Sequence, residues 1–365
     1  MIKFLDLQNQ YLGIKEEVDQ ALSKVINDSA FIGGAEIKNL ERDFAKFQNV
    51  EHCIAVANGT DALEIAIEAL DLPENSEVIV PANSFIASSE AVTRSGHKVV
   101  FCDCDPHNYT ISIDSLKTKI NSKTKAVIAV HLYGHPCDMG ALMDLAEEHD
   151  LIIIEDGAQA HGAEFEGKRV GSIGHIGTFS FYPGKNLGAY GDGGAIVTND
   201  SALAKQCKMI ANHGRIEKYN HVFEGRNSRL DNLQAAVLNV KLKHLEAWTN
   251  QRIAIADYYL QALKEVSQIT LPMREDWARQ VYHLFVIRTD QREELKAYLQ
   301  EKQIQTGIHY PIALPKLEAY KYTGQEAEDF FANRTDGMLL SLPIGEHMSL
   351  EDAEEVVQAI KSYFS

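Results

Sequence analysis

The chain has 365 residues, of which 45% are hydrophobic and 24% are charged, as in globular proteins that fold around hydrophobic cores. This length exceeds what one ordinary core supports, so we expect two domains. The net charge of −17 and the lack of clustered Lys and Arg argue against a nucleic acid partner, although a local pocket for a small anion stays possible.

Neither a signal peptide nor a membrane span is predicted. The opening residues 1–17 have no sustained apolar stretch, and no segment reaches the length of about 18 apolar residues that a membrane helix needs. The 5 cysteines form no CxxC pair, which is typical of a reduced compartment. We therefore expect a cytoplasmic protein that does not associate with membranes.

The first half of the chain alternates short apolar runs with helical patterns. Hydrophobic residues at 37, 40, 44 and 47 have helical spacing, and a strand, a turn and a buried helix follow between 52 and 70. Buried strands are then predicted at 77–81, 98–105, 126–134 and 151–156, separated by helical stretches near 84–95, 114–121 and 138–149. This alternation predicts an α/β fold with a largely parallel sheet, in which ligands gather at the carboxyl ends of the strands.

The pattern changes near residue 229. A long helical stretch, 229–263, leads into a smaller unit with a strand at 282–289 and amphipathic helices at 292–303 and 349–364. Ser349 and Asp352 fit a capping box that opens the last helix. We predict a large domain at 1–240 and a small C-terminal α+β domain at 241–365.

A lysine-centred loop, GTFSFYPGKNLGAYGDGGAIVT at 177–198, is the most informative segment. A lysine that reacts through its amine has to be positioned and partly desolvated, so that a useful fraction is neutral. Most lysines are solvated, but Lys185 follows Phe179, Phe181 and Tyr182 and is surrounded by glycines. Because glycines let the backbone pass close to a bound group, the loop predicts a site that wraps around a ligand.

Asp156, at the end of the apolar strand 151–156, is the second signal. Taken alone, it fits the N-cap of a following turn as well as a carboxylate paired with the nitrogen of a pyridine ring. A lysine for a Schiff base and an aspartate for the ring nitrogen are what a pyridoxal phosphate enzyme needs. Gln159 is then a candidate partner for the phenolic oxygen of the same ring.

The segment Asn-Gly-Thr-Asp at 58–61 is a candidate phosphate site. Gly59 allows the turn, Thr60 caps the helix, and the free N–H groups lie at the positive end of the helix dipole. Asp61 would contribute its backbone N–H, because its carboxylate repels phosphate. Ser180 is a candidate for a further hydroxyl contact. Taken alone, the segment fits an ordinary capped helix better than a phosphate site.

Other motifs are weaker or absent. Phe85 fits a core position as well as a ring that stacks on the pyridine. His161 and His309, judged singly, fit polar structural positions better than catalytic bases. Asn186 follows the lysine where a Walker A loop has Ser or Thr, and the glycines at 191–195 do not complete a dinucleotide fingerprint. No cluster has metal-ligand spacing, so no metal is predicted.

Together these segments resemble the DegT/StrS family of sugar aminotransferases, which are fold type I pyridoxal phosphate enzymes. The resemblance covers nearly the whole chain and rests on NGTDAL (58–63), VPANSFIAS (80–88), EDGAQAHGA (155–163), SFYPGKNLGAYGDGGA (180–195), NHGR (212–215), NSRLDNLQAA (227–236) and HYP (309–311). It implies a mostly parallel, mixed seven-stranded sheet of the aspartate aminotransferase type.

The resemblance also implies roles for individual residues. Lys185 forms the Schiff base, Asp156 pairs with the ring nitrogen, and Gln159 lies near the phenolic oxygen. Phe85 stacks on the ring. Further cofactor contacts come from Gly59, Thr60, Asp61 and Ser180, and substrate contacts from Tyr182, His309 and Tyr310. In relatives, the residues matching Asn227 and Arg229 reach the site from the neighbouring subunit, so a homodimer with shared active sites is implied.

By this resemblance, the enzyme moves an amino group from L-glutamate, released as 2-oxoglutarate, to a nucleotide-linked ketosugar, through pyridoxamine phosphate. The favoured substrate is a dTDP-linked 3-keto-6-deoxyhexose, for an aminosugar of a surface polysaccharide such as a lipopolysaccharide O-antigen, or of another glycoconjugate. A 4-keto sugar of the perosamine type and a UDP-linked 3-keto sugar are alternatives. A non-catalytic sensor or assembly protein and a nicotinamide oxidoreductase are alternatives of other classes.

Overall fold

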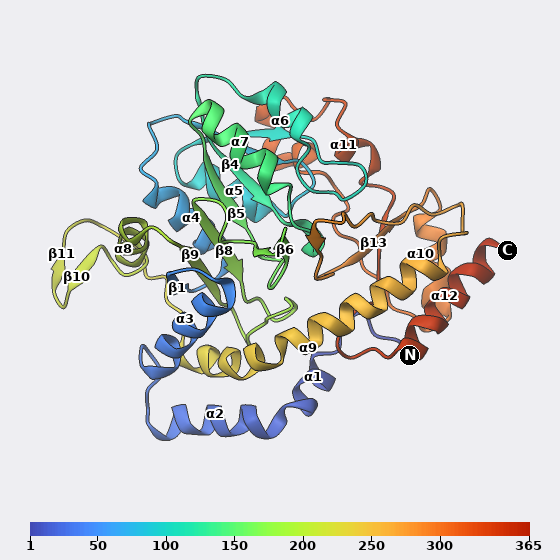
Figure 1. The fold of residues 1–365 in the computed structure, drawn as a ribbon, viewed down its shortest axis with the longest axis horizontal. Helices are drawn as coiled ribbons and strands as arrows, with labels where there is room; N and C mark the ends of the chain where they lie inside the picture. Colours follow the sequence, from blue (N-terminus) through green and yellow to red (C-terminus); the bar gives the residue numbers. More distant parts are fainter.

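A computed structural model describes all 365 residues and has a seven-stranded sheet at its centre (Figure 1). The strand order is β1-β9-β8-β5-β4-β2-β3, and only β9 runs against the others. The predicted α/β class and mostly parallel mixed sheet are therefore confirmed. The strands are β1 (His52–Val56), β2 (Glu77–Pro81), β3 (Lys98–Cys102), β4 (Thr124–Val130), β5 (Ile152–Asp156), β8 (Ile176–Ser180) and β9 (Gly194–Thr198).

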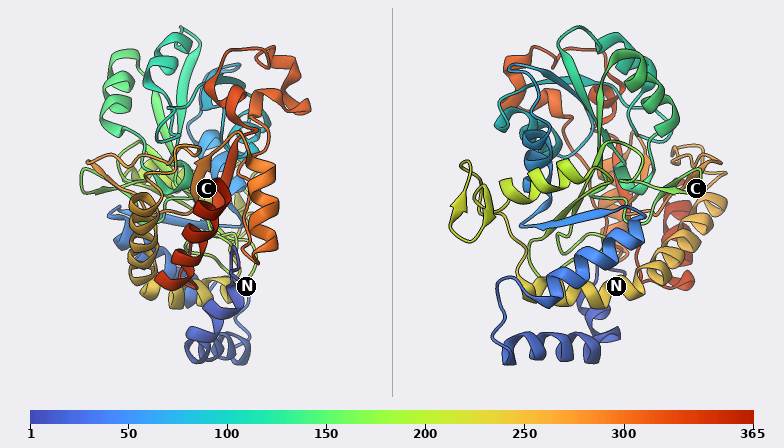
Figure 2. Two further views of the ribbon diagram at one scale, coloured as in Figure 1. Left: turned by 90° about the vertical axis from the view of Figure 1, so that its right-hand side faces the viewer. Right: turned by 60° about the vertical axis from the view of Figure 1, so that its left-hand side comes forward.

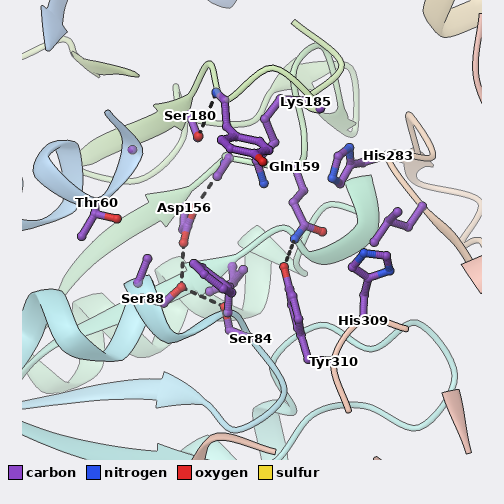
Figure 3. A pocket seen from close by; sticks show the side chains of 18 of the residues that line it. Thr60, Ser84, Ser88, Asp156, Gln159, Ser180, Lys185, His283, His309 and Tyr310 are labelled. Atoms are coloured by element: carbon purple, nitrogen blue, oxygen red, sulfur yellow. Dashed lines mark hydrogen bonds between the residues drawn. The ribbon is translucent and has the colours of Figure 1, made fainter. Parts of the chain in front are cut away.

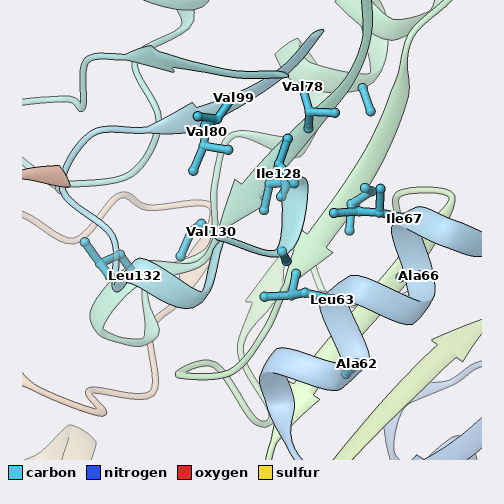
Figure 4. Close-up of a cluster of buried hydrophobic side chains, with 14 of the residues drawn as sticks. Ala62, Leu63, Ala66, Ile67, Val78, Val80, Val99, Ile128, Val130 and Leu132 are labelled. Carbon is cyan, nitrogen blue, oxygen red and sulfur yellow. The ribbon is translucent and has the colours of Figure 1, made fainter. Parts of the chain in front are cut away.

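Both faces of this sheet are buried, because alternate residues of each central strand enter different hydrophobic clusters. Val78 and Ile128 pack on the face covered by α4 (Gly59–Ala69), whose small and branched side chains meet them in Figure 4. Val127 and Ile153 pack on the opposite face, which is covered by α7 (Met139–His149). Strands covered on both faces explain the continuous apolar runs of the sequence.

Helices surround the sheet, and one of them, α9 (Asn232–Ala262), extends beyond it to the elements of the C-terminal part (Figures 1 and 2). This long helix contacts α2 and α3 near its start and α12 near its end. The remaining helices are α1 (Leu7–Gly13), α2 (Lys15–Asn27), α3 (Ala35–Gln48), α5 (Ile86–Arg94), α6 (Ile113–Lys119), α8 (Ser201–Ile210), α10 (Arg292–Glu301), α11 (Phe331–Thr335) and α12 (Leu350–Phe364), with short 3-10 turns η1 (Leu132–Gly134), η2 (Leu314–Lys316) and η3 (Glu318–Thr323). None of them combines the length and apolar composition that crossing a bilayer requires.

The C-terminal part has its own hydrophobic cluster. The antiparallel pair β13 (Phe285–Arg288) and β14 (Leu339–Leu342) packs with α10, α12 and the second half of α9. Ser349 and Asp352 form the predicted capping box at the start of α12. Residue 240 lies inside the uninterrupted helix α9, and the division into 1–240 and 241–365 stays a prediction.

Two small sheets complete the fold. One joins β6 (Glu164–Phe165), β7 (Lys168–Arg169) and β12 (Ala278–Arg279), so it ties the loop after β5 to the segment before β13. The other, β10 (Arg215–Glu217) and β11 (Asn220–His221), is a hairpin that projects from the body of the molecule (Figure 1).

Candidate active site

A cavity of about 620 Å³ opens at the carboxyl ends of β4, β5 and β8 (Figure 3). Its walls come from the start of α4, the segment before α5, the loop after β8, residues 4–5, and four places in the C-terminal part: residues 252, 283–284, 309–310 and 344. The predicted site residues on its wall are Gly59, Thr60, Phe85, Asp156, Gln159, Ser180, Tyr182, Lys185, His309 and Tyr310. Asp61, Asn227 and Arg229 do not line it.

Lys185 lies in a tight loop that follows β8. Its N–H donates to the Tyr182 carbonyl at 2.8 Å, and the Ala189 N–H donates to the Phe181 carbonyl at 2.8 Å. The preceding aromatic side chains, Phe179 and Phe181, are buried beneath the loop. Burial lowers the pKa of Lys185 to about 8, although the nearby Asp156 carboxylate opposes this shift. A useful fraction of the amine is therefore neutral near neutral pH, as a nucleophilic lysine requires.

Asp156 ends β5 and is held by two hydrogen bonds. Its Oδ2 accepts from the Ser88 hydroxyl at 2.8 Å, and its Oδ1 accepts from the Ala158 N–H at 3.1 Å. The Ser84 hydroxyl lies 2.8 Å from that of Ser88, so a short hydroxyl chain leads to the carboxylate. The turn and the site roles of Asp156 are thus compatible. Ser84 and Ser88 were missed from sequence, because Ser88 lies 68 residues from Asp156.

Gln159 and Tyr310 are linked across the cavity. The Gln159 side-chain oxygen accepts from the Tyr133 N–H at 2.7 Å, and its nitrogen lies 3.1 Å from the Tyr310 hydroxyl, which accepts. This pairing fixes the orientation of the amide. It also brings the segment at 309–311 to the end of β5.

The start of α4 has the form of an anion cradle. The Asn58 side chain caps the helix by accepting from the Asp61 N–H at 2.8 Å. The N–H groups of Gly59 and Thr60 precede the first hydrogen-bonded turn and have no partner within the helix. A Cβ on Gly59 would lie 2.6 Å from the Ser180 Cβ, so only glycine permits this approach of helix and strand end. The Asp61 amide is used by the cap and does not face the cavity.

Two large aromatic side chains remain exposed at the cavity. Phe85 is 51% exposed and Tyr182 is 59% exposed. The Phe85 ring contacts the Tyr310 ring at a centroid distance of 5.5 Å. An apolar ring on a cavity wall gains free energy when a flat ring covers it, so Phe85 is suited to the predicted stacking role.

His309 and His161 have different surroundings. The His309 Nδ1 lies 2.8 Å from the Ser341 hydroxyl, and its ring stacks on Phe4 beside the cavity. Burial, with the charge of Lys185, lowers the pKa of His309 to about 4. His161 is fully buried among aromatic rings, and neither of its ring nitrogens has a hydrogen-bond partner. His161 is therefore a packing residue, whereas His309 is a neutral polar group on the cavity wall.

Sequence reasoning missed two cavity residues from the C-terminal part. Arg252 of α9 is 3% exposed and pairs with Glu346 at 2.9 Å. His283 lies just before β13, and its Nδ1 is 3.1 Å from the Asn186 side-chain oxygen. Neither belongs to a local motif, because each reaches the cavity only through tertiary contacts.

Asn227 and Arg229 lie outside the cavity and are exposed. Asn227 forms an isolated bridge with Asn212, close to the β10–β11 hairpin. In a single chain they contribute nothing to the cavity wall. No group of three or more His, Cys, Asp or Glu side chains is arranged to hold a metal ion.

The comparison with protein families identifies the chain. A model of the DegT/DnrJ/EryC1/StrS aminotransferase family matches residues 13–361. The chain belongs to this family. One relative is the dTDP-3-amino-3,6-dideoxy-alpha-D-galactopyranose transaminase of Aneurinibacillus thermoaerophilus, at 45% identity over 100% of this chain and 99% of the relative. Another, at 43% identity over 99% of both chains, is the "Erythromycin biosynthesis sensory transduction protein EryC1" of Saccharopolyspora erythraea.

Solved structures agree with this assignment. DesV of S. venezuelae superposes with a TM-score of 0.97 at 39% identity, covering 100% of this chain and 98% of DesV. NtdA of Bacillus subtilis, solved with bound PMP, has a TM-score of 0.92 at 30% identity, covering 100% of this chain and 85% of NtdA. Aminotransferases of this family depend on pyridoxal phosphate, and the sequence-based family assignment is confirmed. The chain is a pyridoxal phosphate-dependent sugar aminotransferase.

Proposed function

We propose that this enzyme transfers an amino group from L-glutamate to the 3-keto group of a dTDP-linked 6-deoxyhexose. The observation that carries the proposal is the convergence of Lys185 and Asp156 on one cavity that also holds a helix-start anion cradle. The dTDP-3-amino sugar transaminase at 45% identity supports this choice of sugar.

The cavity residues fit pyridoxal phosphate. The free N–H groups of Gly59 and Thr60, with the Ser180 hydroxyl, suit the phosphate. Asp156, ordered by Ser88, suits a protonated ring nitrogen, and the exposed Phe85 suits the flat ring. Gln159 is the candidate neighbour of the phenolic oxygen, and Lys185 is the candidate for covalent attachment.

When bound, pyridoxal phosphate carries the amino group and withdraws electrons from the carbon that loses its proton. With the cofactor bound, the Lys185 amine would move the proton between the substrate carbon and C4′ of the cofactor, and so would act as general acid and base. Asp156 keeps the ring nitrogen protonated. Tyr182, His309 and Tyr310 orient the sugar.

The proposal includes a homodimer with shared active sites. Asn227 and Arg229 are exposed beside the projecting β10–β11 hairpin, where a second copy could receive them. In this arrangement Asn227 contacts the cofactor phosphate of the neighbouring subunit, and Arg229 contacts its substrate. The enzyme would make this aminosugar in the cytoplasm. The product would then enter a surface polysaccharide such as a lipopolysaccharide O-antigen, or another glycoconjugate.

Turnover measurements test the proposal. The purified protein should be yellow, and its visible band should bleach with glutamate. The pyridoxamine form should then be reoxidised by one member of a panel of dTDP-, GDP- and UDP-linked 3- and 4-ketosugars, with NMR locating the new amine. If the enzyme prefers a 4-ketosugar or a UDP-linked sugar, the proposed substrate is wrong and that sugar takes its place.

A sensor role is the second candidate, because one relative is named a sensory transduction protein. Lys185 with a lowered pKa and Asp156 with its ordered hydrogen bonds favour catalysis, since a scaffold has no need for them. A protein that takes up pyridoxal phosphate but is not bleached by glutamate would favour the sensor.

A further inference from the structure

His283 borders the cavity on the same wall as Lys185 and His309 (Figure 3). The surroundings of its two ring nitrogens differ. Nδ1 lies 3.1 Å from the side-chain oxygen of Asn186, the residue that follows the reactive lysine. Nε2 makes no hydrogen bond within the chain, so it is available to whatever fills the cavity.

Neighbouring groups determine which nitrogen of His283 carries the proton. The Asn186 side-chain nitrogen donates to the Val281 carbonyl at 3.2 Å, which turns the amide oxygen of Asn186 toward the imidazole. An amide oxygen can only accept, so Nδ1 of His283 has to be the donor. Asn186 and Val281 are buried, so solvent does not compete for these hydrogen bonds.

The same surroundings keep the ring neutral. Burial lowers the pKa of His283 well below its usual range, and positive charge on Lys185 and Arg252 acts in the same direction. The neighbouring imidazoles of His309 and His161 add to this effect when they are protonated. A neutral imidazole with its proton on Nδ1 presents a lone pair on Nε2. The cavity therefore contains a hydrogen-bond acceptor beside the reactive lysine.

We propose that Nε2 of His283 accepts a hydrogen bond from a hydroxyl group of the hexose and so helps to select the sugar substrate. This inference rests on the proposed function. At neutral pH the carboxylates of glutamate cannot donate, and its amino nitrogen is the group that reacts with the cofactor, whereas every hexose hydroxyl can donate. An acceptor that stays neutral thus suits the sugar half of the reaction, and it stays unpaired when the sugar lacks that hydroxyl.

The two half-reactions separate this role from an effect on Lys185. In the His283→Leu variant, bleaching of the cofactor band by glutamate should proceed at the wild-type rate. Reoxidation by the ketosugar should fall about 10- to 100-fold in kcat/KM, as expected for the loss of one buried hydrogen bond. Equal slowing of both half-reactions would overturn the proposal, because His283 would then act through Lys185.

His161→Leu is the matched control, since it removes a second buried imidazole that lies near His283 but does not line the cavity. Both variants should bind the cofactor, and both half-reactions of the control should match the wild type. Ketosugars that each lack one hydroxyl identify the donor. With the ketosugar that lacks the donor hydroxyl, wild type and His283→Leu should react equally fast. A ratio of the two rates that is the same for every ketosugar would overturn the proposal.

Nitrogen-15 NMR of histidine-labelled protein provides a readout independent of turnover. The wild-type resonances that are absent from the His283→Leu spectrum belong to His283. They should show a protonated Nδ1 and an unprotonated Nε2 between about pH 6 and about pH 8. A proton on Nε2 would overturn the acceptor role. A wild type that does not respond to glutamate at all would instead overturn the proposed function, so the two failures are distinct.

Discussion

The two groups of predicted site residues have very different surroundings. Lys185 and Asp156 lie on one cavity wall with their partners already in place, whereas Asn227 and Arg229 are exposed and away from it. Lys185 follows β8 and Asp156 ends β5, and the sheet places the carboxyl ends of these two parallel strands side by side. The second pair follows a projecting hairpin. Sheet topology thus brings Lys185 and Asp156 together within one chain, whereas the proposed contacts of Asn227 and Arg229 require a second copy.

The largest effect is expected at Lys185. Lys185→Ala removes both the covalent attachment and the proton carrier, so kcat for amino transfer should fall by at least about 10³-fold. Steady-state turnover with glutamate and the preferred ketosugar measures this. Unchanged far-UV circular dichroism is the control, and substantial residual turnover would mean that another group moves the proton.

Asp156→Asn should cause the next largest loss of activity. The neutral amide cannot keep the ring nitrogen protonated, and a loss of about 10²- to 10³-fold in kcat is typical when one preorganised electrostatic group is removed. Turnover and the pH dependence of the cofactor absorption report the change. A variant with normal turnover would show that Asp156 serves only the turn that it forms with Ala158.

Arg229→Glu tests the proposed contribution of the second subunit to the site. A charge reversal at this exposed residue should leave folding intact but lower kcat/KM for the sugar about 100-fold. Co-expression with Lys185→Ala should restore roughly a quarter of wild-type activity, because half of the dimers are mixed and each mixed dimer has one intact site. Without any recovery, the two residues would act in the same subunit's site.

The lowered pKa of Lys185 predicts how cofactor uptake depends on pH. Below about pH 8 the amine is mainly protonated and cannot attack the aldehyde, and above it the amine is neutral. Covalent uptake of pyridoxal phosphate by the apoenzyme should therefore accelerate about tenfold between about pH 7 and about pH 9. Stopped-flow absorbance measures the rate, and a rate that keeps rising about tenfold per pH unit toward the usual lysine pKa, without levelling above about pH 8, would contradict the effect of burial.

The smallest effect is expected at Ser88, which acts through Asp156. Ser88→Ala removes the donor to Oδ2 and should lower kcat about fivefold while it shifts the pH titration of the bound cofactor. Ser88→Thr should restore both. Ser89→Ala is the control, because this buried neighbour instead bonds the Tyr320 hydroxyl at 2.8 Å. Equal effects of Ser88→Ala and Ser89→Ala would indicate a packing role alone.

Local sequence patterns predicted the main cofactor-binding residues but few of the residues that surround them. Lys185, Asp156 and the start of α4 were visible because each needs a particular residue at a strand end or a helix start. The partners were not visible. Ser88 lies 68 residues from Asp156, and His283 lies 97 residues from Asn186, so no local pattern links them.

The sequence by itself determined the family, the alternating α/β pattern and the chemistry of the reactive lysine, because these depend on residue types and their short-range spacing. Only the tertiary structure decided which groups surround that lysine. The orientation of the His283 ring, the hydroxyl chain to Asp156 and the exposure of Arg229 depend on how distant segments pack. Packing sets hydrogen-bond partners and burial, and these in turn set which groups are charged, which donate and which are left to meet another molecule.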